Sequence, residues 1–462
     1  MSGGVRREII EELKSIVGNE WVISAREAIE GYLYDETPIP IRPEACGDVV
    51  VVKPGSSEEV SRILQLANRY LIPVFPRGGG TGLAGACIPT ISGIILSLER
   101  MNKIVVDVDN LMAEAEAGAT LKDLIEAADR AGLSFPLHPG DEGAQIGGLI
   151  ACNAGGARAI KTGIMRNCVK GIEVVLPTGE IIRLGGKVLK NNVGYDLMHL
   201  IIGSEGTLGV ITKAWIRLQP RDVASATIVI PFEGREQALG MVPKIFKEGI
   251  VPLAVEYVER NLVEMVAKSL GLKWPCTSAE YQLIVILSET SEDALLGALE
   301  RLLNLCEKSG ALEPVVAETR KEQDEILKIR SEIYSTLKPN MVDILDATVP
   351  PARLIDLIET VNDLERKYGV YMPVYGHAGD GNLHVHLMKW DGWTEEKYDE
   401  LRRIIYARAL ELGGTITGEH GIGYVRRKYV EMVLDRKSIE LMREIKRIFD
   451  PNNVLNPDKV LP

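Results

Sequence analysis

The sequence predicts an α+β fold divided into more than one domain. At 462 residues the chain is too long for a single hydrophobic core. From Gly47 to Pro220 short apolar strands alternate with amphipathic helices. After Asp222 longer strands alternate with long charged helices, and glycine becomes rarer in the loops. This change predicts that a second domain begins near residue 221.

The first half contains two helices and a hairpin. Residues 58–71 and 121–132 each repeat apolar side chains with a period of about 3.6, which is typical of a helix with one buried face. The second helix should end at Gly132, because glycine is a common C-terminal cap. Residues 172–184 predict two strands joined by a turn at Pro177–Gly179.

The second half is predicted to contain strands at 226–232, 253–258 and 282–287, which alternate with charged helices. A final helix begins at Lys437 and ends before Pro451, since proline cannot continue a helix. This helix carries one apolar stripe, so it needs an existing surface on which to bury that stripe.

The composition excludes several classes of protein. A net charge of −12 argues against a nucleic-acid or anionic-membrane surface, because such partners require basic residues. The N-terminal residues lack the apolar core of a signal peptide, and no apolar run is long enough to cross a bilayer, which predicts a cytoplasmic protein. The six cysteines show no C-x-x-C spacing, so they fit neither a zinc ribbon nor iron–sulfur ligands.

A glycine-rich stretch at Pro76–Thr90 contains a Gly-x-Gly-x-x-Gly pattern that ends at Gly85. The dinucleotide fingerprint requires a helix after this pattern, but Pro89 and Gly93 lie where that helix should be. The stretch therefore favours a loop whose backbone amides bind a phosphate without a following helix.

Two more glycine-rich segments follow, at 138–163 and 203–212. Ordinary turns that need positive φ explain any single glycine in them. Because several such clusters alternate with small residues, together they favour close approach of the backbone to a long, flat ligand.

Three of the six histidines fall within ten residues, at His377, His384 and His386. If residues 382–387 form a strand, its period of two places His384 and His386 on one face. Converging imidazoles suit Zn²⁺ or another divalent transition metal. The alternative, in which each histidine is an ordinary packing residue, stays open at this point.

A second cluster places Glu419 and His420 between glycines. A carboxylate and two histidines would hold a metal with open positions for a substrate oxygen, and His420 could accept a proton. The remaining His138 and His199 have no such neighbours and are interpreted as structural.

Seven motifs in order carry a family resemblance: "PRGGGTGLAGACIP", "HPGD", "IGGLIACNAGG", "GSEGTLGVIT", "GHAGDGNLH", "GEHGIG" and "NPDKV". Together they resemble the FAD-dependent D-2-hydroxyacid dehydrogenases of the vanillyl-alcohol oxidase/p-cresol methylhydroxylase superfamily. The nearest branch is that of glycolate oxidase catalytic subunits and D-lactate dehydrogenases. The resemblance extends over residues 40–460.

The resemblance implies a domain organisation. Residues 1–220 would form a two-part FAD-binding domain of the p-cresol methylhydroxylase (PCMH) type. Residues 221–410 would form a mixed α/β cap that binds the substrate on an antiparallel sheet. Residues 411–462 would form a helical segment that returns to the FAD domain and completes the active site.

The resemblance also implies the flavin contacts. The loop Arg77–Gly82 would hold the FAD pyrophosphate with backbone amides. Some members attach flavin to a histidine where this chain has Thr81, so the FAD should be noncovalent. The residues implied to bind FAD are Pro76, Arg77, Gly78, Gly79, Gly80, Thr81, Gly82, Pro139, Gly140, Gly147, Gly148, Asn153, Gly163, Glu205, Gly206, Gly209, Ile211 and Asn456.

On the substrate side, the resemblance implies that His377, His384 and Glu419 bind a divalent metal: Zn²⁺, with Mn²⁺ or Fe²⁺ as alternatives. It makes His420 the catalytic base and His386 a residue that packs behind the ligands. Arg330 would bind the substrate carboxylate, since a planar guanidinium matches a planar anion.

Two departures from the family pattern concern the substrate. Many relatives carry tryptophan where this chain has Leu327, and the 2-hydroxyglutarate enzymes carry lysine where it has Ile344. Without that lysine a second substrate carboxylate lacks a partner, so the sequence favours a monocarboxylate.

The implied reaction is oxidation of a D-2-hydroxy acid, D-lactate or glycolate, to the 2-oxo acid, with hydride transfer to flavin N5 and the proton taken by His420. Electrons would pass to an external acceptor: an iron–sulfur subunit, a quinone or a cytochrome. The protein would be a homodimer in the cytoplasm, with a partner holding it at the inner face of the membrane.

Two alternatives remain at the sequence level. One is an FAD-containing alkyl transferase of the same fold, which causes no net oxidation. The other is a noncatalytic flavin subunit of an oxidase complex. The combined presence of Arg330, His377, His384, Glu419 and His420 argues against both.

Overall fold

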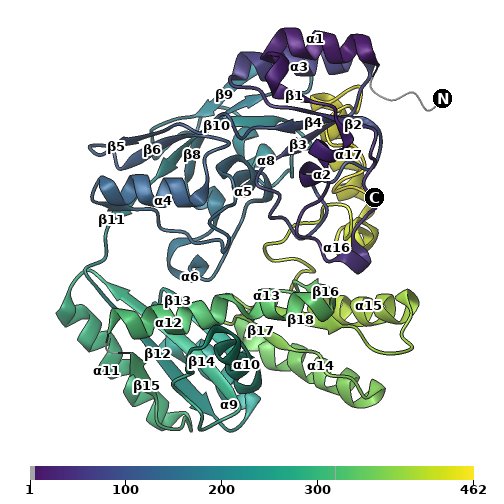
Figure 1. The fold of residues 1–462 in the computed structure, drawn as a ribbon. Helices are drawn as coiled ribbons and strands as arrows, with labels where there is room; N and C mark the ends of the chain where they lie inside the picture. Colours follow the sequence, from purple (N-terminus) through teal and green to yellow (C-terminus); the bar gives the residue numbers. More distant parts are fainter. Residues whose placement is uncertain (1–5, 318) are drawn as a thin grey trace. The chain divides into compact units, whose positions relative to one another are not determined.

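The computed structural model describes residues 6–317 and 319–462 (Figure 1). The chain divides into two compact units. Unit 1 consists of Met1–Ala154, Ile164–Pro220 and Glu419–Pro462, and unit 2 consists of Gly155–Gly163 and Arg221–Gly418. None of the helices in the described ranges combines the length and the apolar composition that crossing a bilayer requires.

The first sheet of unit 1 has the order β1-β2-β4-β3. Its strands are β1 (Val22–Ile23), β2 (Val49–Val52), β3 (Val74–Arg77) and β4 (Gly93–Ser97), and β2, β4 and β3 run parallel. The four valines of β2 are all buried, as expected for a parallel strand that is covered on both faces. Helices α1 (Arg7–Val17) and α3 (Ser57–Tyr70) share one core with this sheet, and α2 (Arg26–Leu33) packs on its other face.

The second sheet of unit 1 is antiparallel, with the order β5-β6-β10-β8-β9. Its strands are β5 (Ile104–Asp107), β6 (Met112–Glu116), β8 (Val169–Val175), β9 (Ile181–Gly185) and β10 (Val210–Arg217). Helices α4 (Leu121–Arg130) and α5 (Ile146–Cys152) belong to its core. A capping box between Thr120 and Asp123 starts α4.

The remaining elements of unit 1 are short, except for the last helix. They are β7 (Leu133–Ser134), α7 (Met165–Cys168), α8 (Leu197–Ile201), β11 (Gln219–Pro220), α16 (Val430–Val433) and α17 (Arg436–Phe449). Ile445 and Phe449 of α17 pack against the core of the second sheet. The apolar stripe of the final helix therefore covers an existing surface.

Unit 2 contains one seven-stranded antiparallel sheet with the order β15-β12-β14-β13-β17-β18-β16. The strands are β12 (Ala224–Phe232), β13 (Ala254–Glu259), β14 (Tyr281–Glu289), β15 (Val315–Ala317), β16 (Met341–Leu345), β17 (Val374–His377) and β18 (Asn382–Met388). The chain leaves and re-enters this sheet through helices, so its antiparallel order brings residues that are distant in sequence side by side.

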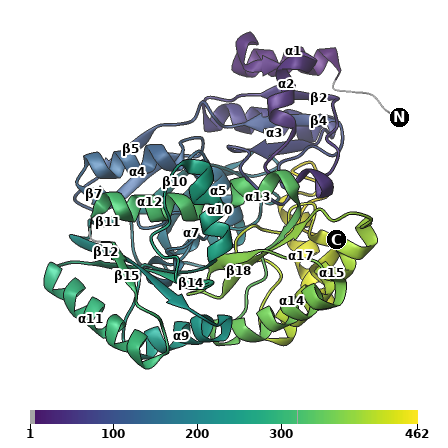
Figure 2. The same cartoon turned by 60° about the horizontal axis from the view of Figure 1, so that its bottom comes forward.

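Helices cover both faces of this sheet (Figure 2). One face carries α10 (Arg260–Leu270), α12 (Arg320–Ser331) and α13 (Ile333–Leu337), whose apolar residues share a core with the strands. The other face carries α9 (Arg235–Lys247), α11 (Glu292–Lys308), α14 (Leu354–Tyr368) and α15 (Glu395–Glu411). The short α6 (Ala159–Thr162) completes the unit.

The sheet core of unit 2 gives a stability prediction. Ile284 of β14 is fully buried in the cluster under α10 and α12, so Ile284→Ala should destabilise the protein by about 2–5 kcal/mol through lost burial and a cavity. Met265 of α10 is 41% exposed, and Met265→Ala should change stability by less than about 0.5 kcal/mol. Urea denaturation followed by tryptophan fluorescence measures both, and equal effects would contradict this description of the core.

Candidate active site

In unit 1 the glycine loop follows β3 directly and packs against the segment that leads into α5. A Cβ on Gly79 would lie 2.7 Å from the carbonyl oxygen of Gly143, which leaves no room for a side chain. A Cβ on Gly78 would contact Gly148 of α5 at 3.6 Å. No helix follows the loop before β4, as the sequence predicted. The loop therefore brings two stretches of bare backbone close together.

The guanidinium of Arg77 lies directly against Gly80 of the loop, where an added Cβ would clash with it. The same guanidinium donates to the carbonyl oxygens of Tyr34 at 3.0 Å and Gly31 at 3.2 Å. Arg77 thus ties α2 and the residues after it to the end of β3.

Among the described residues of unit 1, the buried side-chain oxygens without a hydrogen-bond partner include Gln145 Oε1, Ser204 Oγ and Asn456 Oδ1. Gln145 lies against Gly78, and Asn456 lies against Gly206. Buried polar atoms normally have a partner. A polar group such as FAD fits these unpaired atoms and the bare backbone of the loop.

Glu205 holds the segment that follows His420. Its fully buried carboxylate accepts the backbone N–H groups of Ile422 and Gly423, each at 2.8 Å. A Cβ on Gly421 would lie 2.9 Å from this carboxylate, and Gly421 has a φ of +79°. Burial raises the pKa of Glu205, and the two N–H groups oppose that rise. The side chain of Glu205 is therefore committed to the chain after His420.

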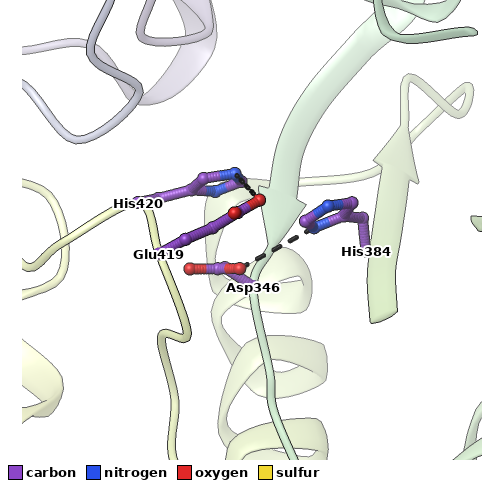
Figure 3. A group of neighbouring side chains, drawn as sticks. All are labelled: Asp346, His384, Glu419 and His420. Carbon is purple, nitrogen blue, oxygen red and sulfur yellow. Dashed lines mark ion pairs between the residues drawn. The ribbon is translucent and has the colours of Figure 1, made fainter. Parts of the chain in front are cut away.

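A group of possible metal ligands forms around the Gly418–Glu419 peptide bond (Figure 3). Asp346, His384, Glu419 and His420 each offer one ligand atom, and these atoms lie within 4.8 Å of one another. The N–H of Gly418 donates to the carbonyl of Asp346 at 3.0 Å, so the chain just before Glu419 is fixed beside Asp346. Three of the four residues were predicted as site residues from the sequence.

Asp346 is the member of this group that sequence reasoning missed. It is fully buried, and it accepts hydrogen bonds from Asn382 Nδ2 at 2.8 Å and Thr417 Oγ1 at 2.6 Å. Its Oδ1 lies 3.7 Å from His384 Nδ1. In the sequence, Asp346 is recognisable only as an acid directly after the apolar strand β16. A single acid forms no repeating pattern, so the sequence did not mark it as a site residue.

His377 lies beside this group without being one of the four. Its ring meets the ring of His384 edge to face, with centroids 5.3 Å apart. Its Nδ1 is 2.6 Å from Oε1 of Glu256, a β13 residue that the sequence analysis did not select. The other predicted substrate-side residue, Arg330, donates from Nε to Oε2 of the same Glu256 at 2.7 Å. Its guanidinium lies 4.6 Å from the centre of the Tyr375 ring.

Glu256 is 2% exposed, so its charge requires partners. Burial raises the pKa of Glu256, but Arg330 and His377 together outweigh this effect and lower the pKa to about 2. His386 is fully buried, and its ring stacks on Tyr375 with centroids 5.0 Å apart. His386 thus packs within the sheet face and lies outside the group of four.

The remaining predicted flavin residues lie in loops and at element ends. Pro139 and Gly140 precede α5, which contains Gly147 and Gly148; Asn153 follows α5, Gly163 follows α6, and Gly209 and Ile211 lie at the start of β10. The Oδ1 of Asn153 accepts the N–H of Arg166 at 3.0 Å, so this side chain already has one partner.

A buried lysine lies near the glycine loop. Lys459 is 4% exposed, and its Nζ has no hydrogen-bond partner among the described residues. The Nζ lies 5.4 Å from the ring centre of Phe75 and 5.3 Å from that of Tyr424. Burial lowers the pKa of Lys459 to about 8, because two aromatic faces replace only part of its hydration.

Comparison with known proteins defines the class of this protein. Residues 49–185 match the FAD binding domain family, and residues 221–460 match the family of the C-terminal domain of FAD linked oxidases. The protein is therefore an FAD-dependent oxidoreductase. The chain belongs to the FAD linked oxidase family.

Two relatives are similar over nearly their whole length. The chain is 46% identical to a D-lactate dehydrogenase of Archaeoglobus fulgidus, over 94% of this chain and 96% of the relative. It is 34% identical to the glycolate oxidase subunit GlcD of Bacillus subtilis, over 99% of this chain and 97% of the relative. These similarities confirm the family resemblance that the seven motifs predicted.

The solved structure of p-cresol methylhydroxylase with substrate bound resembles this chain with a TM-score of 0.77. The match covers 99% of this chain and 98% of the other, at 16% identity, so it concerns the fold. It confirms the predicted α+β fold of the PCMH type, and the match of residues 49–185 to the FAD binding domain family supports FAD as the cofactor.

Lys459 gives a pH prediction. Between pH 8 and 10.5 the folded protein binds fewer protons at Lys459 than the unfolded chain does, so the contribution of Lys459 to the unfolding free energy should rise with pH. Relative to Lys459→Met, the wild type should gain on the order of 2–3 kcal/mol over this window. Urea denaturation across the pH range measures the gain.

The matched control is Lys437→Met on the exposed surface of α17, whose lysine side chain is 68% exposed. This variant controls for the loss of one exposed lysine charge, so the effect of burial is the excess of the Lys459→Met difference over the Lys437→Met difference. Equal differences for the two variants across the pH range would show that Lys459 keeps an ordinary pKa in the folded protein.

Proposed function

We propose that the protein oxidises a D-2-hydroxy acid, with D-lactate and glycolate as the first candidates, to the 2-oxo acid. The observation that carries this proposal is the grouping of His384, Glu419 and His420 with Asp346, in a chain whose relatives include a D-lactate dehydrogenase and a glycolate oxidase subunit. A metal-binding group beside a histidine suits the removal of a hydroxyl proton.

In this proposal the two units divide the work. Residues 1–220 bind FAD without a covalent bond, since Thr81 offers no imidazole, and residues 221–410 bind the substrate. Residues 411–462 contribute Glu419, His420 and the flavin contact Asn456. Bound FAD supplies the acceptor for a hydride from the substrate α-carbon.

The proposed metal ligands are His377, His384 and Glu419. Their nitrogen and oxygen donors suit Zn²⁺, and also Mn²⁺ or Fe²⁺. A divalent metal there would lower the pKa of a hydroxyl that it binds. Asp346 joins this set as a carboxylate close to His384.

Arg330 and His420 have different roles. Arg330 binds the substrate carboxylate, and its placement over Tyr375 and against Glu256 restricts the guanidinium to one orientation. His420 accepts the hydroxyl proton. Glu205 supports this role, because it fixes the backbone two and three residues after His420.

Ile344 supports a monocarboxylate substrate. This residue is 2% exposed within β16, so it places an apolar side chain where the 2-hydroxyglutarate enzymes carry a cation. The electron acceptor is proposed to be external: an iron–sulfur subunit, a quinone or a cytochrome. A homodimer and a cytoplasmic location, with a partner at the membrane face, complete the proposal.

Anaerobic titration of the purified flavoprotein tests the proposed function directly. D-lactate or glycolate should bleach the flavin absorbance and yield pyruvate or glyoxylate in equal amount, while L-lactate should not. A flavin that stays oxidised with D-lactate, glycolate and larger D-2-hydroxy monocarboxylates would overturn the proposal. It would favour the alkyl transferase or the noncatalytic subunit.

The role of His420 gives a further prediction. His420→Asn should retain FAD but slow flavin reduction by substrate about 10²- to 10⁴-fold, the usual contribution of a general base. Stopped-flow absorbance under anaerobic conditions measures the rate. His199→Asn is the control, because His199 contacts Asp196 on the surface of α8 and should leave the rate unchanged. Equal rates in both variants would remove His420 from the mechanism.

A further inference from the structure

Glu256 is a carboxylate that joins two predicted site residues. It lies in β13, near the middle of the sheet of unit 2, and is 2% exposed. One of its oxygens faces His377 Nδ1 at 2.6 Å, and the other accepts from Arg330 Nε at 2.7 Å. Both oxygens therefore bind side chains to which the proposed function gives a role, His377 as a metal ligand and Arg330 as the partner of the substrate carboxylate.

The fold produces this contact through strand register. Tyr257 of β13 pairs with Gly376 of β17, and in an antiparallel pair the next position sets Glu256 opposite His377. The face that carries Glu256 is covered by α12, whose last turn provides Arg330. Arg330 and His377 lie 74 and 121 residues from Glu256 in the sequence, and both contact its carboxylate.

The acid also determines which nitrogen of His377 carries the proton. An ionised carboxylate can only accept hydrogen bonds, so the Nδ1 of His377 must donate. In the neutral ring Nε2 then keeps its lone pair, the form in which imidazole binds a metal. The ring of His377 lies beside that of His384, a member of the metal-binding group.

We propose that Glu256 is a positioning residue that holds His377 in the Nδ1–H tautomer for metal binding and fixes the guanidinium of Arg330 for the substrate carboxylate. This inference rests on the proposed function. Glu256 touches neither metal nor substrate, and it acts through the two side chains that do.

The same strand contains a matched acid without this role. Glu259 is also 2% exposed and also pairs with an arginine, Arg235, at 2.6 Å. Its other partners are the hydroxyls of Tyr257 and Tyr371, and no histidine is among them. Loss of charge at Glu259 therefore measures the structural effect of neutralising a buried acid in β13.

The test compares Glu256→Gln with Glu259→Gln in the full-length flavoprotein. In Glu256→Gln the amide oxygen should accept from the Arg330 cation, because charge-assisted hydrogen bonds are stronger. The amide NH₂ then faces His377 and makes Nδ1 an acceptor, which moves the proton to Nε2. Zn²⁺ binding, measured by competition with a chromophoric chelator, should weaken about 10- to 100-fold.

Glu259→Gln should leave the Zn²⁺ affinity at the wild-type value. Equal weakening in both variants would make Glu256 a structural residue only, and unchanged affinity in Glu256→Gln would remove it from the site. Either result overturns the inference.

A second measurement determines the tautomer of His377 in the wild-type protein itself. In metal-free wild-type protein with ¹⁵N-labelled histidine, the His377 signal, assigned by its loss in His377→Asn, should show a protonated Nδ1 and an unprotonated Nε2. The opposite tautomer would overturn the inference. The proposed function is tested separately: it fails if D-2-hydroxy monocarboxylates do not reduce the wild-type flavin, whatever the Zn²⁺ affinities are.

Discussion

In each unit of this protein, buried carboxylates hold neighbouring polar groups in place through hydrogen bonds. An ionised acid without water can only accept hydrogen bonds, so it dictates which neighbouring groups must donate. Glu205 takes two backbone N–H groups and thereby fixes the chain after His420. Glu256 accepts hydrogen bonds from Arg330 and His377, and Asp346 accepts them from Asn382 and Thr417. Each acid orients groups beside a histidine of the candidate site.

Stability alone does not account for the pair of Glu256 and Arg330. Removing two charges from water is costly, and apolar residues of similar volume often replace buried ion pairs without loss of stability. The surrounding face of the sheet is apolar, with Val258, Ile284 and Ile329 in one cluster, so an apolar replacement would fit there. We therefore infer that the ion pair serves to orient His377 and Arg330.

The FAD-binding unit relies on a different constraint, which is the close approach of backbone to backbone. The loop after β3 and the segment before α5 can approach because Gly79 carries no side chain, since a Cβ there would clash with the carbonyl oxygen of Gly143. Bare backbone leaves N–H groups available to an anion, and the Arg77 guanidinium donates to the carbonyl oxygens of Tyr34 and Gly31, which ties α2 to the end of β3. The glycine-rich pattern is therefore a packing requirement, and the proposed contact with FAD uses the same bare backbone.

Local patterns allowed prediction of α3, α4 and the strand that carries His384 and His386, because helical and strand periods are visible in a short window. They also allowed prediction of a glycine loop without a helix, since Pro89 interrupts the segment. Glu256 and Asp346 were not predictable in this way. Each is a single acid within or directly after an apolar strand. Which side chains it contacts depends on cross-strand register and on helices that return from far along the chain. Long-range pairing has no local signal, so residues that position a site are harder to find from sequence than residues that form it.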